Sequence, residues 1–342
     1  MKIEEIKKWY IDNQKIFFAS IELTQCCNFK CKHCYCSEKT KPDLSLNQHM
    51  KIIDKLADTG CLFLNFTGGE IFTYKNFKAI YTYAKDKGFV IDLLTNASLI
   101  TEEIVELFKE LPPHNIAITI YGTNEEDYFK FTGDKNNYKK VLNGLNLLKE
   151  SKIPFVLRTV ATKTLQNSLL NGSFEKMAKD YDTTFKYDPI IFPKISGDKS
   201  PLNESLNIEQ IIELESTNEL RKATWKKEIM SNRIENHKPY CWSCNAGINS
   251  LSIDSQGNAF VCGLYRDFPI SMIDYDIASI LEHLKKIHTE HMRIVSTNEC
   301  SSCEYRNLCN WCPAYARVYN NNDYDKISFF CKLTEARVKN FG

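Results

Sequence analysis

Three cysteines near the beginning of the chain have a spacing that suits an iron–sulfur cluster. Cys27, Cys31 and Cys34 stand in a C-x3-C-x2-C pattern directly after a short apolar run. Three thiolates on one short loop can hold three irons of a [4Fe–4S] cluster and leave the fourth iron open to another ligand. A structural zinc ion normally takes four protein ligands, so three cysteines alone fit zinc poorly. A zinc knuckle or buried free thiols are the alternative interpretations.

Eight further cysteines lie near the end of the chain, which is the right number for two four-ligand sites. They are Cys241, Cys244, Cys262, Cys300, Cys303, Cys309, Cys312 and Cys331. Fourteen cysteines in an intracellular chain of 342 residues indicate metal or redox chemistry rather than disulfides. Four-thiolate sites suit zinc as well as iron–sulfur clusters, so on spacing alone a pair of zinc ribbons is the rival interpretation.

Charge and composition argue against several classes of protein. The formal net charge is +1, so the chain has no excess of positive charge that would attract nucleic acid. Residues 1–18 mix acids, bases and apolar residues, so they do not resemble a signal peptide, and no stretch is long and apolar enough to span a bilayer. We therefore expect a cytoplasmic protein without nucleic-acid or membrane partners.

The elements that must position the first cysteines alternate between short apolar runs and helical patterns. Strand-like runs occupy residues 17–23, 62–67, 90–95, 116–121, 155–161 and 184–187. Helical patterns occupy residues 46–59, 74–87, 101–111, 136–151 and 172–180. Six β/α units predict an α/β fold, a partial (β/α)6 TIM-like barrel with its chemistry at the carboxyl ends of the strands.

The composition of the sequence and its pattern of apolar residues divide the chain into four segments. We predict an N-terminal segment (1–16), the barrel (17–197), a polar bridging region (198–240) with one helix over 208–230, and a loop-rich iron–sulfur domain (241–342). One hairpin stands out in the last region, with strands over 250–253 and 258–262 joined by the turn Asp254-Ser255-Gln256-Gly257.

The first cysteine pattern and a segment further along resemble the radical SAM superfamily. That segment, Thr67-Gly68-Gly69-Glu70, is similar to the family's Gly-Gly-Glu motif. The resemblance implies that S-adenosylmethionine (SAM) chelates the open iron through its amino and carboxylate groups. It also implies that the glycines let the backbone approach the methionyl moiety and that carbonyl or acidic oxygens accept from its ammonium group. A plain turn with an acid at a helix start is the alternative.

Further candidate cofactor contacts follow from the resemblance and from strand ends. His33 and Tyr35 stand where the family places rings near the adenine, and Thr119 where related sequences often have a serine that contacts the cofactor. Asn96 lies at the end of the third strand-like run. Arg158 either binds the SAM carboxylate or forms a structural ion pair.

The C-terminal cysteines closely resemble the SPASM extension of radical SAM enzymes, which carries two auxiliary [4Fe–4S] clusters. The match covers residues 241–331 and departs from the usual spacing only in having two residues, not three, before Cys312. The resemblance implies one cluster on Cys241, Cys244, Cys262 and Cys312, and another on Cys300, Cys303, Cys309 and Cys331. Without Cys241, the first of these would have an open iron able to touch substrate. The expected cofactors are thus three [4Fe–4S] clusters and SAM.

SPASM-bearing enzymes mostly modify peptides, so the resemblance implies a radical SAM oxidoreductase acting on a peptide. We expect it to cleave SAM to a 5′-deoxyadenosyl radical and to form a thioether or carbon–carbon crosslink in a ribosomally made peptide. The alternatives are a sulfatase-maturing (formylglycine-generating) enzyme, a peptide epimerase, or a non-enzymatic iron–sulfur or zinc electron carrier or scaffold. Sulfatase-maturing relatives have an acid directly after the cysteine that corresponds to Cys262. Here Gly263 follows and the nearest acid is Asp267, which disfavours that alternative.

The same resemblance suggests the partners. Only about sixteen residues precede the first strand-like run, so we expect either a separate precursor-binding protein or direct binding of the peptide. A flavodoxin- or ferredoxin-like protein would donate the electron. Of the three cysteines outside both patterns (Cys26, Cys36 and Cys61), Cys36 is a candidate hydrogen-atom donor. Cys36 and Asp267 are the catalytic candidates.

Overall fold

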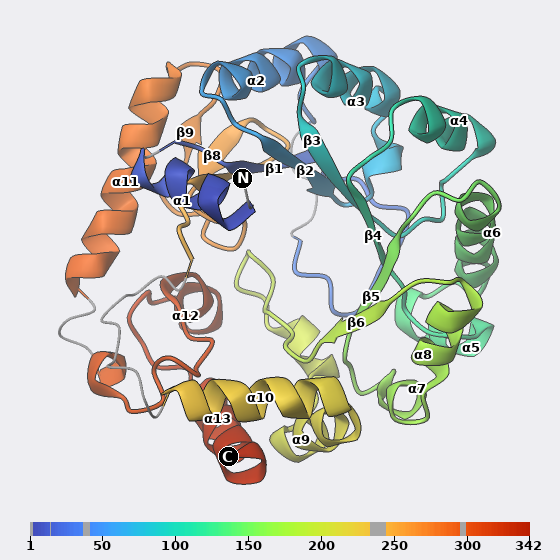
Figure 1. The fold of residues 1–342 in the computed structure, drawn as a ribbon, viewed down its shortest axis with the longest axis vertical. Helices are drawn as coiled ribbons and strands as arrows, with labels where there is room; N and C mark the ends of the chain where they lie inside the picture. Colours follow the sequence, from blue (N-terminus) through green and yellow to red (C-terminus); the bar gives the residue numbers. More distant parts are fainter. Residues whose placement is uncertain (1–2, 14, 37–41, 233–243, 295–298) are drawn as a thin grey trace.

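One curved sheet runs through the protein in the computed structural model, which describes residues 3–13, 15–36, 42–232, 244–294 and 299–342. Six parallel strands pair in the order of the chain, and helices cover the outer face of the curve (Figure 1). The strands are β1 (Phe18–Thr24), β2 (Phe63–Gly68), β3 (Val90–Thr95), β4 (Asn115–Thr119), β5 (Val156–Val160) and β6 (Phe185–Asp188). The predicted parallel α/β sheet is confirmed, with each strand within three residues of its expected range at both ends.

The helices between these strands are α2 (Leu46–Asp58), α3 (Phe77–Asp86), α4 (Glu102–Glu110), α5 (Glu125–Thr132), α6 (Asn136–Glu150), α7 (Gln166–Leu170) and α8 (Ser173–Asp180). Side-chain caps begin several of them: Ser45 and Gln48 form a capping box on α2, and Thr101 accepts from the backbone of α4. Their apolar faces bury against the strands. The sequence did not predict α1 (Ile3–Asp12), α5 or α7, of which α5 and α7 have only eight and five residues.

The sheet continues beyond β1 with three strands from the C-terminal region. The strands β7 (Ser250–Ile253), β8 (Asn258–Phe260) and β9 (Ile270–Ser271) extend it on the other side of β1. β7 pairs parallel to β1, and the predicted hairpin β7–β8 is confirmed. Asp254 holds its turn by accepting from the backbone of Gln256 and Asn258 at 3.0 and 2.8 Å. Strand β1, which leads into the cysteine loop, is therefore paired on both edges. The predicted boundaries at 197 and 240 stay predictions.

The remaining helices are α9 (Ile208–Thr217), α10 (Glu219–Asn232), α11 (Ile277–Ile294), α12 (Pro313–Asn320) and α13 (Ser328–Phe341). The single helix expected over 208–230 is wrong, because the backbone leaves the helical conformation at Asn218. The C-terminal region is also less loop-rich than expected, since α11, α12 and α13 lie in it. In Figure 1, α9, α10, α12 and α13 lie between β6 and α11, beside the open edge of the curved sheet.

Polar contacts hold the helices of this second half together and join them to the barrel. Glu215 of α9 is fully buried and accepts two hydrogen bonds from the guanidinium of Arg337 in α13, at 2.7 and 2.9 Å. The Tyr319 hydroxyl of α12 donates to the carbonyl of Ile191, just after β6, at 2.5 Å. Among the described residues, no helix is both long enough and apolar enough to cross a membrane.

Candidate iron–sulfur and cofactor site

The first three cysteines lie together on the loop that follows β1. Cys27 is exposed, and Cys31 and Cys34 are partly buried. The backbone amide of Cys34 donates to the carbonyl of Cys31 at 3.1 Å, and the thiols interact electrostatically with one another. Burial raises the pKa of Cys27 to about 11 and that of Cys31 further. Because a ligating thiol must lose its proton, metal binding at this loop would release protons.

The turn after β2 holds this loop through backbone contacts. Gly68 has a φ of 134°, and a Cβ on it would lie 2.2 Å from the carbonyl oxygen of Thr24. A Cβ on Gly69 would lie 2.2 Å from the carbonyl oxygen of Cys26. The backbone amides of Gly69 and Glu70 donate to these same carbonyls, each at 2.8 Å. The structure therefore gives both glycines a role in seating the cysteine loop, and their contact with the cofactor stays a prediction.

Glu70 links three strands at this end of the sheet. Its carboxylate is 1% exposed and accepts from the Thr95 hydroxyl at 2.6 Å and from the amide of Asn96 at 2.7 Å. The Asn96 side chain donates in turn to Asn28 in the cysteine loop at 3.0 Å. Burial raises the pKa of Glu70 to about 7, against the effect of its hydrogen bonds. Glu70 and Asn96 thus position the loop, whatever contact they make with SAM.

Aromatic rings surround the buried side of the cysteine loop. Tyr121, two residues beyond β4, stacks on Phe131 with ring centroids 5.3 Å apart, and the His33 ring lies 5.5 and 5.1 Å from these two rings. The Tyr121 hydroxyl forms a hydrogen bond with Cys31. The His33 Nδ1 atom is buried without a hydrogen-bond partner among the described residues, and burial lowers the pKa of His33 to about 4. These rings shield the loop from water on this side.

The remaining predicted cofactor contacts lie on the same edge or the concave face of the sheet. Thr67 is in β2, one residue before the glycine turn. Thr119 of β4 is the register partner of Arg158 of β5, and Arg158 is exposed while its strand neighbours Leu157 and Thr159 are buried. Tyr35 is 36% exposed and lies just beyond Cys34. Their roles in SAM binding stay predictions.

One set of C-terminal cysteines gathers close to the barrel. The thiols of Cys244, Cys262 and Cys312 interact electrostatically with one another. Cys262 follows β8, and Cys312 is the N-cap residue of α12. Burial raises the pKa of Cys312 to about 12. Cys241, the predicted fourth member, lies outside the described residues.

The second set surrounds a cavity of about 420 Å³. Cys300, Cys303, Cys309 and Cys331 all line it, and their thiols interact electrostatically. Tight turns position the first three, and α13 carries Cys331. Within the described part of the chain, no three His, Cys, Asp or Glu side chains are placed to hold a metal ion. Thiols placed around a cavity do fit a polynuclear cluster, since each sulfur then binds a different iron.

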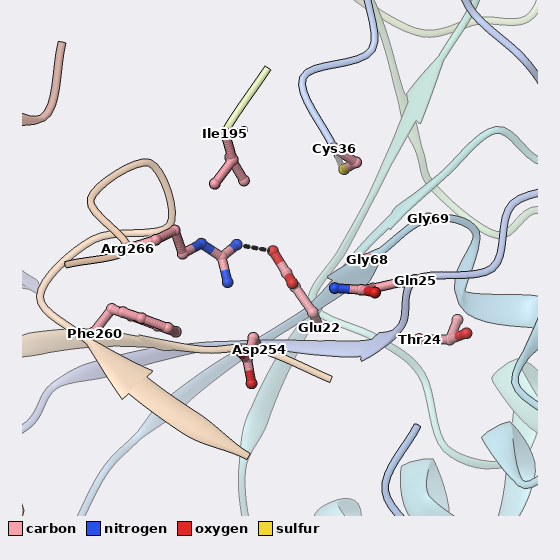
Figure 2. A pocket seen from close by; sticks show the side chains of 10 residues that line it. All are labelled: Glu22, Thr24, Gln25, Cys36, Gly68, Gly69, Ile195, Asp254, Phe260 and Arg266. Atoms are coloured by element: carbon pink, nitrogen blue, oxygen red, sulfur yellow. Dashed lines mark hydrogen bonds and ion pairs between the residues drawn. The ribbon is translucent and has the colours of Figure 1, made fainter. Parts of the chain in front are cut away.

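A pocket of about 200 Å³ lies where β1, the glycine turn and the β7–β8 hairpin meet (Figure 2). Glu22 of β1 and Arg266 form an ion pair across it, and the Cys36 side chain also lines it. Asp267 does not line this pocket but pairs with Arg317 at 2.5 Å. The sequence analysis missed Glu22, Arg266 and Tyr121. Glu22 could have been found as a charged residue within an otherwise apolar strand. Nothing in the sequence near Arg266 indicated that it would pair with Glu22.

Comparison with known proteins agrees with this arrangement. Residues 21–167 match the radical SAM superfamily. The chain is 26% identical over 332 residues to the AdoMet-dependent heme synthase of Methanosarcina barkeri, covering 91% of this chain and 94% of that protein. It is 25% identical over 327 residues to the antilisterial bacteriocin subtilosin biosynthesis protein AlbA of Bacillus subtilis, covering 90% and 69%.

A solved structure shares the fold across both halves of the chain. The crystal structure of Streptococcus suis SuiB bound to precursor peptide SuiA superposes with a TM-score of 0.71 at 14% identity, covering 96% of this chain and 79% of that one. Radical SAM chemistry requires one [4Fe–4S] cluster and SAM, and the loop at Cys27, Cys31 and Cys34 has the spacing for that cluster. The chain thus contains a radical SAM domain over residues 21–167 and is a radical SAM enzyme.

Proposed function

We propose that this enzyme forms a thioether or carbon–carbon crosslink in a ribosomally made peptide. The observation that carries the proposal is the pair of C-terminal cysteine sets beside a radical SAM domain, in a chain similar over 90% of its length to a bacteriocin biosynthesis protein. A crosslink removes two hydrogen atoms from the substrate, so an electron must leave after the first hydrogen atom is abstracted. Two auxiliary [4Fe–4S] clusters at these sets would receive it, which brings the expected total to three clusters.

The residues of this chain have distinct tasks in that reaction. Cys27, Cys31 and Cys34 would hold the first cluster, and SAM bound there would supply the radical that abstracts hydrogen from the peptide. Gly68, Gly69 and Glu70 hold the cysteine loop against β1, and the rings around Tyr121 exclude water from its buried side. Arg158 lies exposed beside Thr119 on the concave face, where it can bind a carboxylate. A flavodoxin- or ferredoxin-like donor and a separate precursor-binding protein are the proposed partners.

A second candidate rests on a specific similarity. The match to the heme synthase covers 94% of that protein's length, so modification of a tetrapyrrole is a second candidate function beside modification of a peptide. Sulfatase maturation and peptide epimerisation are further alternatives, and each has its own product. Gly263 after Cys262 disfavours sulfatase maturation, and epimerisation does not need two auxiliary clusters.

The test is mass spectrometry of a short precursor peptide encoded next to this gene and co-expressed with the enzyme. Loss of two hydrogen atoms, with a linkage located by fragmentation, is the expected result. An aldehyde from a Cys or Ser peptide would select sulfatase maturation, and an unchanged mass with an inverted centre would select epimerisation. Conversion of iron coproporphyrin III by the reconstituted enzyme, with the peptide untouched, would overturn the proposal.

A further inference from the structure

The pocket in Figure 2 joins the radical SAM domain to the C-terminal region. Glu22 and Gln25 come from the end of β1, Gly68 and Gly69 from the turn after β2, and Phe260 and Arg266 from the hairpin region. Gly68 and Gly69 lie next to the cysteine loop, so a group in the pocket would lie near the site of hydrogen abstraction. This position suits substrate.

Several polar groups in the pocket have unused hydrogen-bonding capacity. The Arg266 guanidinium lies 5.0 Å from the Phe260 ring centre, donates from Nε to the Gly263 carbonyl at 2.6 Å and pairs with Glu22 through Nη2. Within the described residues, its Nη1 group and the Glu22 Oε2 atom make no hydrogen bond. Donors and an acceptor therefore face the same small space.

Gln25 adds a hydrogen-bond donor to the pocket. Its side-chain amide nitrogen makes no hydrogen bond among the described residues, whereas its side-chain oxygen is buried away from the pocket. In Figure 2 its amide nitrogen points toward the Glu22 side of the pocket. A carboxamide there can donate to a bound carbonyl.

Charge and size narrow the ligand class. Glu22 and Arg266 are paired with each other, and the Asp254 carboxylate accepts hydrogen bonds from its own turn (Gln256 and Asn258), so no unpaired cation among the described residues lines the pocket. A volume of about 200 Å³ lies below the 300–1,000 Å³ of most small-molecule sites. The pocket therefore suits a neutral group of amino-acid size, and the residues described around it offer no unpaired cation for the carboxylates of a tetrapyrrole.

We propose that this pocket binds one neutral peptide unit of the substrate, whose carbonyl accepts from Gln25 and Arg266 and whose N–H donates to Glu22. The inference rests on the proposed peptide function and adds where, and through which groups, the peptide is held. Residues on either side of the bound unit would then extend from the pocket into the concave face of the sheet.

The test measures binding of blocked tripeptides, acetyl-Gly-X-Gly-amide with X neutral (Asn), acidic (Asp) or basic (Lys), to the reconstituted enzyme with SAM. The wild-type enzyme should bind the neutral peptide most tightly. Gln25→Leu should weaken that binding about tenfold, as expected for a lost hydrogen bond of about 1.4 kcal/mol, and leave SAM affinity, iron content and melting temperature unchanged. Gln256→Leu, outside the pocket, is the matched control and should change none of these.

A second variant tests the charge balance. Glu22→Gln leaves Arg266 without its ion-pair partner and makes the pocket less negative, so the preference should shift toward the acidic peptide. Equal affinity of the wild type for all three peptides, or no effect of either variant, overturns the inference and leaves the peptide function intact. Loss of SAM affinity in Gln25→Leu would instead assign the pocket to the cofactor. Binding of iron coproporphyrin III in place of every peptide would overturn both proposals.

Discussion

The two regions of this enzyme bring their cysteines together in different ways. In the barrel, three cysteines within eight residues lie on the loop that follows strand β1. The glycine turn, Glu70 and Asn96 hold this loop in place. In the C-terminal region, the cysteines are spread from Cys244 to Cys331 and meet only because a hairpin, several turns and two helices dock together. The first site is locally encoded, whereas the other two depend on packing between distant segments.

Removing the first site should have the largest effect. Changing Cys27, Cys31 and Cys34 together to Ala should reduce formation of 5′-deoxyadenosine from SAM to background, because electron transfer into SAM needs the cluster with the open iron. Iron should fall from about twelve to about eight per chain, since each cubane holds four irons. Iron analysis and a cleavage assay after anaerobic reconstitution check both. Cleavage that survives the change would contradict the role of the first site.

A change in the C-terminal sets should separate product from SAM cleavage. Cys309→Ala should leave about eight irons per chain and abolish the crosslinked product while 5′-deoxyadenosine still forms. The proviso is that the domain folds, because cluster binding also contributes folding free energy, so circular dichroism accompanies the assay. Cys61→Ala, a buried cysteine outside all three sets, is the control and should keep about twelve irons. Normal product from a folded Cys309→Ala enzyme would remove the electron-accepting role.

Acid should weaken the barrel through His49. This side chain of α2 is 1% exposed, and burial lowers its pKa to about 4. Within the part of the chain that the structure describes, its Nε2 atom has no hydrogen-bond partner. The folded pKa lies below the unfolded value, so the stabilisation is present above about pH 6.5 and is lost as pH falls toward 4, by up to about 3 kcal/mol. Urea unfolding of wild type and His49→Gln between pH 5 and 8 measures the difference. A difference that does not change with pH would refute it.

The buried ion pair between α9 and α13 should matter less for the chemistry than any of the three clusters, but more for stability than any surface pair. Glu215→Gln leaves the buried Arg337 without its charged partner and should lower the free energy of unfolding by about 3 kcal/mol. Glu103→Gln breaks the exposed pair with Lys78 and should change it by less than about 0.5 kcal/mol. Urea titration of both variants makes the comparison, and equal losses would show that the α9–α13 contact is not a fastening point.

The smallest expected effect concerns the ring beside Cys31. Tyr121→Phe removes a hydrogen bond to a predicted ligand, which favours the more negatively charged reduced cluster, so the reduction potential should fall by about 40 mV, equivalent to about 1 kcal/mol. Tyr128→Phe is the matched control, because the Tyr128 hydroxyl is buried without a partner among the described residues. Redox titration followed by electron paramagnetic resonance reads the potential. Equal shifts in both variants would remove the role of the hydroxyl.

Much of the fold and of the first site was open to sequence reasoning because the signals are local. The six β/α strands appear as apolar runs of the right length, and the first cysteines, together with Thr67 to Glu70, sit directly after two of them. Parallel strands bring their carboxyl ends to one edge, so these residues had to meet there. The division of the C-terminal cysteines into two groups also followed from their spacing and the SPASM resemblance.

Only the tertiary structure could decide what lies across from these residues. The pairing of β7 with β1, the Glu22–Arg266 ion pair and the Glu215–Arg337 contact join residues more than a hundred positions apart, and no periodicity encodes such partners. The same holds for Asp267, whose pairing with Arg317 and position away from the Figure 2 pocket were invisible in its neighbours. Spacing along the chain thus indicated what the cysteines could bind, whereas long-range packing decided which polar groups surround the pocket in Figure 2.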